Sequence, residues 1–167
     1  MNDARPSPRP LLAAFFRAPG WLYRIRLGWI PGRRFLALTH RGRKSGHEHR
    51  TVLEVISYDE ATDESIVVSA YGAKADWYRN IKKEPALRVE TGRVDYVPEQ
   101  RFLDPEERAA TARSFCREHP WEAKLMPRVL TSIGAEVPDS SEVDAEQMLS
   151  ALPMVALRPA SRQFPRR

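Results

Sequence analysis

The chain has 167 residues, and its hydrophobic content of 42 % predicts a single globular domain with a real core and excludes a disordered chain. No apolar run approaches the roughly 20 residues of a membrane-spanning helix, and the one cysteine, Cys116, excludes an intrachain disulfide and a cysteine-based zinc cluster. The net charge is +5, but residues 1–50 hold eleven Lys and Arg against two acidic residues, so this half is expected to face a phosphorylated cofactor, a lipid surface or nucleic acid.

The first 34 residues are predicted to lie outside the main domain. Residues 1–10 are rich in Pro and Arg and are expected to form a disordered basic tail. Residues 11–34 mix large apolar side chains with arginines, which favours an amphipathic helical segment packed across the domain, with peripheral membrane contact as the alternative. Arg17 interrupts the only stretch that resembles a signal peptide, so the sequence predicts a cytoplasmic protein, membrane-associated on the cytoplasmic face if that segment binds lipid.

Short strands dominate the region that follows. Apolar and alternating runs predict strands at 35–39, 51–58, 65–71, 87–90, 94–97 and 154–157, and residues 101–103 are expected to extend the hairpin that turns at Thr91-Gly92. About six antiparallel strands with few helices predict an α+β fold, a small barrel with peripheral helices. We expect this cofactor-binding domain to span residues 35–158, followed by a basic tail at 159–167.

Helix signals punctuate the strands. Residues 76–83 form a short helix that Pro85 closes, and Asp104 followed by Pro105 marks the start of a helix that reaches about residue 118. Further helices are expected at 121–133, broken near Pro127, and at 142–151. Cys116 falls on the second of these helices and is expected to be an inert packing residue.

A cationic loop, residues 41–46 (RGRKSG), joins the first two predicted strands. Its two glycines permit backbone angles that let main-chain N–H groups converge on an anion. Arg43 can donate two hydrogen bonds to a phosphate, Lys44 adds a point charge, and Arg50 could return to the same place. The alternative is a solvated basic turn. The spacing of a nucleotide P-loop is absent, and the nearby histidines at 40, 47 and 49 do not by their spacing predict a metal site.

A second informative stretch is residues 69–80 (SAYGAKADWYRN), where a strand ends in small residues, bends at Gly72 and enters a helix. Small residues at a strand end let a flat ring lie against the backbone, and a helix N-terminus attracts negative charge. The alternative is a packed strand-to-helix corner with Trp77 in the core.

Three motifs together, LxLTxRGRKSG, RTVLEV and GAKADWYRNIKKEP, resemble the deazaflavin-dependent nitroreductase family of split β-barrel oxidoreductases. The resemblance covers about residues 35–97 and implies a groove for coenzyme F420, an 8-hydroxy-5-deazaflavin, with FMN as the alternative. It assigns the phosphate and acidic tail to Arg43, Lys44, Ser45 and either His49 or Arg50. Further coenzyme contacts fall on Thr51, Val52, Ser69, Ala70, Tyr71, Gly72, Trp77 and Asn80.

The resemblance also implies an activity. Reduced deazaflavin would give hydride to a small-molecule acceptor such as a quinone, a nitro compound or an activated alkene, and Tyr71 is the candidate catalytic donor near that acceptor. A non-catalytic carrier of deazaflavin or flavin is the first alternative, and binding to nucleic acid or an anionic surface is the least favoured. No metal and no nucleic-acid partner are expected, and either a monomer or a homodimer is compatible with the sequence.

Overall fold

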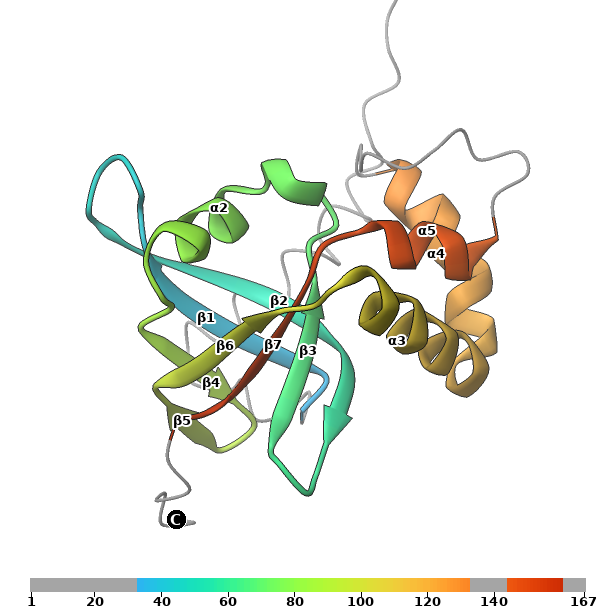
Figure 1. Ribbon diagram of the computed structural model, residues 1–167, viewed down its shortest axis with the longest axis horizontal. Helices are drawn as coiled ribbons and strands as arrows, with labels where there is room; N and C mark the ends of the chain where they lie inside the picture. Colours follow the sequence, from blue (N-terminus) through green and yellow to red (C-terminus); the bar gives the residue numbers. More distant parts are fainter. Residues whose placement is uncertain (1–32, 133–143, 161–167) are drawn as a thin grey trace, which may run out of the picture.

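The computed structural model describes residues 33–132 and 144–160. Its strands form one antiparallel sheet in the order β5-β4-β1-β2-β3-β7-β6 (Figure 1). The strands are β1 (Phe35–Arg41), β2 (Glu48–Asp59), β3 (Glu64–Val68), β4 (Arg88–Thr91), β5 (Val94–Tyr96), β6 (Pro98–Phe102) and β7 (Met154–Pro159). The described helices are the 3-10 turn η1 (Gly72–Lys74), α2 (Asp76–Lys83), α3 (Pro105–Glu118), α4 (Pro120–Ser132) and α5 (Ala145–Ala151).

The sheet nearly closes into a barrel because its two end strands are consecutive in the chain. Val97 alone separates β5 from β6. β5 pairs with β4, whereas β6 pairs with β7. The N–H of Ala160 donates to the carbonyl of Val97 at 3.1 Å, which ties the end of β7 to this crossing point. The predicted α+β class and antiparallel barrel are confirmed, with seven strands in place of about six.

Two hydrophobic clusters lie on opposite sides of β7. Alternation of side chains along a strand sends Val155 and Leu157 into the barrel cluster, and Met154 and Ala156 into a second cluster with α3 and α5. Figure 1 shows α3, α4 and α5 grouped beside the barrel, while α2 lies apart from them near the β1–β2 connection. Cys116 is partly buried and packs at the edge of the second cluster, where burial raises the pKa of its thiol.

Two predicted boundaries are wrong for tertiary reasons. The strand expected at 65–71 ends at Val68, because Ser69 and Gly72 close a turn. The Gly72 N–H donates to the Ser69 carbonyl at 2.9 Å, the Ser69 hydroxyl donates to the Gly72 carbonyl at 2.7 Å, and Gly72 has a φ of 61°. Residues 101–103 do not extend the β4–β5 hairpin, since β6 begins at Pro98 and pairs with β7.

The break expected near Pro127 is also wrong, because α4 runs from Pro120 to Ser132 with Pro127 inside it. The expectations for residues 1–10, most of 11–34 and 161–167 lie outside the described residues. Within the parts of the chain that are described, no helix has the length and apolar character to cross a membrane.

Candidate functional site

The β1–β2 connection is a tight loop with a defined backbone. The two strands stay in register to the pair Arg41 and Glu48, which leaves residues 42–47 to make the turn. The Gly42 N–H donates to the His47 carbonyl at 2.8 Å, and the Gly46 N–H donates to the Gly42 carbonyl at 2.8 Å. Gly46 has a φ of 70°, a conformation that favours glycine. The backbone of the loop is therefore held in one shape, although residues 44–47 are exposed to solvent.

Helix α2 holds this loop from the side. Asn80 Oδ1 accepts hydrogen bonds from the Arg43 backbone N–H at 3.0 Å and from Arg43 Nη1 at 3.1 Å. Arg43 Nη1 also donates to Asp76 Oδ1 at 2.7 Å, and Lys83 Nζ donates to the Arg43 carbonyl at 2.8 Å. The hydrogen bond from Arg43 lowers the pKa of Asp76. Arg43 is thus pinned with only 18 % of its side chain exposed.

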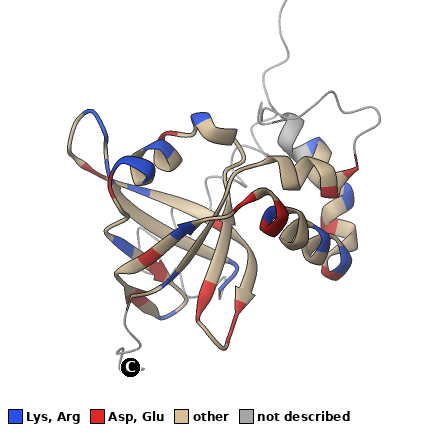
Figure 2. Cartoon of the chain, in the orientation of Figure 1, with Lys and Arg blue, Asp and Glu red and all other residues tan. Residues whose placement is uncertain are grey.

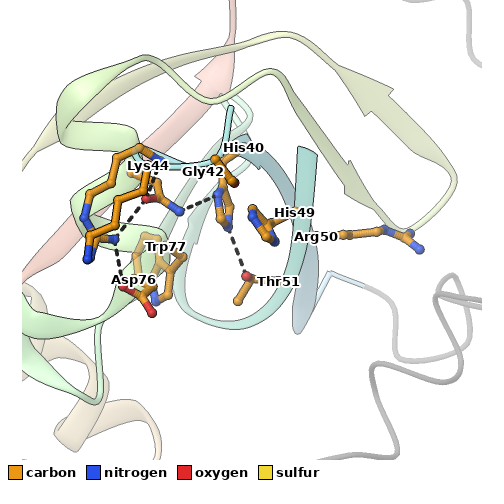
Figure 3. Close-up of a pocket in the computed structure, with 11 residues that line it drawn as sticks. His40, Gly42, Lys44, His49, Arg50, Thr51, Asp76 and Trp77 are labelled. Atoms are coloured by element: carbon orange, nitrogen blue, oxygen red, sulfur yellow. Dashed lines mark hydrogen bonds and ion pairs between the residues drawn. The ribbon is translucent and has the colours of Figure 1, made fainter. Parts of the chain in front are cut away.

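A cavity of about 410 Å³ opens between the loop, β2 and α2 (Figure 3). Lys and Arg gather on this loop and on α2 in Figure 2. Lys44 makes no hydrogen bond or ion pair with any residue in the described parts of the chain, so its ammonium group is available to an anion. The lining residues are His40, Gly42, Arg43, Lys44, Ser45, His49, Arg50, Thr51, Asp76, Trp77 and Asn80.

His40 forms the buried floor of this arrangement and is only 2 % exposed. Its Nδ1 lies 3.2 Å from Asn80 Nδ2, its Nε2 lies 3.1 Å from Thr51 Oγ1, and its ring stacks on His49 with centroids 5.9 Å apart. Burial, then the neighbouring charge of His49, lowers the pKa of His40, while the Arg41 backbone and the Asp76 carboxylate act in the opposite direction. The surroundings of the ring therefore favour its neutral form.

Eight of the predicted coenzyme-binding residues line this one cavity: Arg43, Lys44, Ser45, His49, Arg50, Thr51, Trp77 and Asn80. The strand alternation of β2 separates His49 from Arg50. His49 pairs across the sheet with His40 and stacks on it, whereas Arg50 points away from the cluster in Figure 3 and pairs with Glu90 at 2.9 Å. Trp77, 8 % exposed, belongs to the barrel core and also lines the cavity, so its two interpretations are compatible.

The other predicted residues lie outside the lining of this cavity. They are Val52, Ser69, Ala70, Tyr71 and Gly72. The last four form the segment between β3 and η1 that leads into α2. Ser69 is fully buried in its turn, whereas Tyr71 is 53 % exposed.

Three lining residues were not among the predicted site residues: His40, Gly42 and Asp76. A period-two signal was available for His40, because Leu36 and Leu38 are buried on the face that His40 continues. Among the described residues, no group of three His, Cys, Asp or Glu side chains comes together in a way that could hold a metal ion.

Comparison with solved structures identifies the fold. An FMN-binding protein from Nostoc punctiforme, related to pyridoxamine 5'-phosphate oxidase, aligns with a TM-score of 0.50 at 12 % identity, covering 94 % of this chain and 82 % of its own. An F420-H2 dependent reductase aligns with a TM-score of 0.48 at 19 % identity, covering 76 % of this chain and 96 % of its own. A structure described as a domain-swapped dimer aligns with a TM-score of 0.47 at 18 % identity, covering 84 % of this chain and 99 % of its own. Among curated proteins, none matches.

The nearly closed antiparallel barrel thus defines a split-barrel protein. The model of one protein family, described as F420H(2)-dependent quinone reductase, matches residues 17–125. The chain belongs to this family. It is accordingly an oxidoreductase, a deazaflavin-dependent reductase whose cofactor is coenzyme F420. The resemblance that the sequence motifs carry is confirmed.

Proposed function

We propose that the cavity between the β1–β2 connection and α2 binds the phosphate and acidic tail of coenzyme F420, and that the chain reduces a quinone. The cavity itself carries the proposal, because it joins two cations, Arg43 and Lys44, to the hydroxyl groups of Ser45 and Thr51 in one concave surface. This donor set fits a phosphate, which accepts hydrogen bonds from guanidinium, ammonium and hydroxyl groups.

Arg43 is the residue best prepared to hold the anion. Its guanidinium is already oriented by Asn80 and by Asp76, whose side chain is 81 % exposed. A phosphate that enters the cavity can displace the exposed carboxylate of Asp76 from Arg43, or bind Arg43 beside it. Neither event requires the arginine side chain to move. Little side-chain entropy is then lost on binding, which is the advantage of a preorganised site.

Bound reduced coenzyme F420 supplies a hydride to an electron-poor acceptor. The protein's part is to position the coenzyme, exclude water and stabilise negative charge that develops on the acceptor. Trp77 offers an aromatic edge of the cavity for the coenzyme. Ser69, Ala70 and Gly72 stay proposed contacts of the deazaflavin ring, and Val52 stays a proposed coenzyme contact from β2. We further propose that Tyr71, half exposed ahead of α2, donates a hydrogen bond to the acceptor.

The first experiment is a fluorescence titration of the purified protein with coenzyme F420 and, separately, with FMN. Arg43→Ala combined with Lys44→Ala should weaken binding of coenzyme F420 by roughly a hundredfold or more, since two charge-assisted contacts are removed. Arg117→Ala combined with Lys124→Ala is the matched control, because it removes the same charge from exposed positions of α3 and α4. Unchanged affinity in the loop variant would show that the loop does not bind the coenzyme. Tighter binding of FMN than of coenzyme F420 would show that the site prefers FMN.

The acceptor needs its own assay. Reduced coenzyme is mixed with protein and a quinone such as menadione, a nitroarene or an activated alkene, and oxidation of the coenzyme is followed by absorbance. We expect the quinone to be the best of the three substrates, with Tyr71→Phe slowing turnover while leaving coenzyme affinity in place. Tight binding without turnover of any acceptor would instead support a carrier. The same preparation, analysed by light scattering, distinguishes a monomer from a homodimer.

A further inference from the structure

The buried polar side chains beneath the cavity form a chain of hydrogen bonds whose direction is fixed by chemistry. The Arg43 backbone N–H and its guanidinium can only donate, and both reach the same side-chain atom of Asn80. That atom must therefore be the carbonyl oxygen. The amide nitrogen of Asn80, which can only donate, then faces His40 Nδ1 at 3.2 Å.

The orientation of Asn80 in turn fixes the tautomer of His40. Nδ1 has to accept, so it carries no hydrogen, and the neutral ring bears its proton on Nε2. Nε2 then donates to Thr51 Oγ1 across 3.1 Å. The hydroxyl of Thr51 keeps its own hydrogen, and Thr51 lines the cavity. Hydrogen bonds are therefore donated in one direction along these side chains: Arg43 donates to Asn80, Asn80 donates to His40, and His40 donates to Thr51. We call this series of hydrogen bonds the relay.

We propose that His40 is a positioning residue for the anion in this cavity: as a neutral ring protonated on Nε2, it turns the Thr51 hydroxyl hydrogen toward the ligand and keeps Asn80 locked on Arg43. This role rests on the proposed binding of the coenzyme's phosphate and acidic tail in the cavity. The relay links the buried ring of His40 to Arg43 and Thr51, which are more open to the cavity. It also makes the anion site sensitive to protons.

Protonation of His40 breaks the relay at a defined point. A proton on Nδ1 would face the Asn80 amide nitrogen, and two donors would then meet at 3.2 Å. If the amide rotates to offer its oxygen to His40, its nitrogen faces the two donors of Arg43 instead. Either arrangement leaves donors without acceptors beneath the loop, which opposes the attraction between the added charge and the anion. We expect the lost hydrogen bonds to outweigh that attraction, so that the affinity for the anion falls.

The pH window follows from the sign of the pKa shift. Burial lowers the pKa of His40 below its ordinary value. The neutral ring is then the form that the fold favours, so the relay is intact above about pH 6.5 and is lost only when the pH falls through the lowered pKa of His40. The charged or titratable groups around the ring are His49 on β2, Asp76 on α2, and Arg43 and Lys44 in the loop. Of these, His49 is the other imidazole, and its charge acts on His40, so it needs a control.

Nitrogen NMR of the histidine rings in ¹⁵N-labelled protein tests the tautomer without any ligand. At about pH 7.5 the His40 ring should show its hydrogen on Nε2. A hydrogen on Nδ1, or a doubly protonated ring, would overturn the relay whether or not the coenzyme binds. His40→Gln identifies the His40 resonances by their disappearance.

The role in binding is tested by titrating coenzyme F420 at a series of pH values from about 7.5 down to about 4.5. Wild-type affinity should fall roughly tenfold more between these values than that of His40→Gln, whose amide does not titrate. The comparison of the two proteins cancels any titration of the coenzyme itself. His49→Gln, whatever its absolute affinity, should keep a pH-dependent fall in affinity, moved to higher pH because the charge of His49 no longer lowers the pKa of His40. Equal pH profiles for wild type and His40→Gln would overturn the proposal.

A second pair of variants provides a test that does not depend on whether the His40→Gln variant folds. Thr51→Val preserves the side-chain shape but removes the hydroxyl, and should weaken binding about tenfold at neutral pH. Thr51→Ser keeps the hydroxyl and should bind within about threefold of wild type. If Thr51→Val binds like wild type, the hydroxyl plays no part and the inference fails. If wild type itself binds no coenzyme, the proposed function fails, while the NMR result still decides the tautomer.

Discussion

At the scale of single residues, Gly42 matters for the side chain that it lacks. A Cβ placed on it would lie 2.5 Å from Ser45 Oγ and 2.8 Å from His49 Nε2. Both atoms belong to side chains that line the cavity. The bare backbone at Gly42 therefore allows Ser45 and His49 to approach one another over the loop. Gly46 differs, because its φ of 70° requires glycine while the space around it is open.

We predict that Gly42→Ala separates binding from stability. The added methyl pushes Ser45 and His49 out of place, and affinity for coenzyme F420 should fall by about tenfold or more. The clashing atoms are the ends of side chains, which can rotate, so the free energy of unfolding should fall by less than about 1 kcal/mol. Calorimetry of binding and urea unfolding of the same samples measure both quantities.

Gly46→Ala is the matched control for this prediction. It adds the same methyl to open space but strains the backbone, and should cost about 1 kcal/mol of stability with a smaller loss of affinity. Wild-type affinity in Gly42→Ala would show that the close approach has no role in the site.

The sequence predicts the chemistry of the site better than its geometry. Arg43, Lys44 and Ser45 stand out because charge and glycine spacing are local signals, and Asn80 and Trp77 follow from the family motif. Whether His49 or Arg50 faces the cavity depends on the register between β1 and β2, which no local pattern records. The sequence predicts Asp76 only as the first residue of a helix. Its hydrogen bond with Arg43 joins residues 33 positions apart, which no local pattern indicates.

At the scale of elements, a similar division holds. The end of α2 and the start of α3 follow from the sequence because Pro85, the Asp104 cap and Pro105 act within a few residues. The end of β3 and the pairing of β6 were missed because the Ser69 turn and the approach of β7 decide them. Pro127 misled the prediction because a proline weakens a helix locally, whereas packing of the whole helix decides whether it continues.

Helix α3 allows a direct test of a local signal. The Glu107 N–H donates to Asp104 Oδ1 at 2.9 Å, and the Asp104 N–H donates to Glu107 Oε2 at 3.1 Å, which completes a capping box. Asp104→Ala should lower the free energy of unfolding by about 1 kcal/mol. Asp144→Ala is the control, since Asp144 precedes α5 without a side-chain capping bond, and it should cost less than about 0.5 kcal/mol. Equal losses in urea unfolding would contradict the assignment.

At the scale of the whole molecule, strand β7 contributes side chains to the core of the barrel and to the core of the helical layer. Leu157, fully buried, packs into the barrel cluster, and Met154 packs with Leu149 of α5 in the second cluster. The strand lies between β3 and β6, so it also completes the sheet. Because one strand supplies both cores, the helices cannot lose their packing without disturbing the barrel that carries the site.

The prediction at this scale is that the described structure unfolds as one unit. Leu157→Ala and Leu149→Ala each remove a buried leucine from one side of β7, and each should cost about 3 kcal/mol. Native-state hydrogen exchange measures the free energy of opening separately for amides of β1 and of α5. If β7 couples the two cores, the free energy of opening falls by the same amount for the most protected amides of β1 and of α5 in each variant. A loss confined to α5 in Leu149→Ala, with β1 unchanged, would show that the helical layer opens alone and that the proposed anion site on the barrel is independent of it.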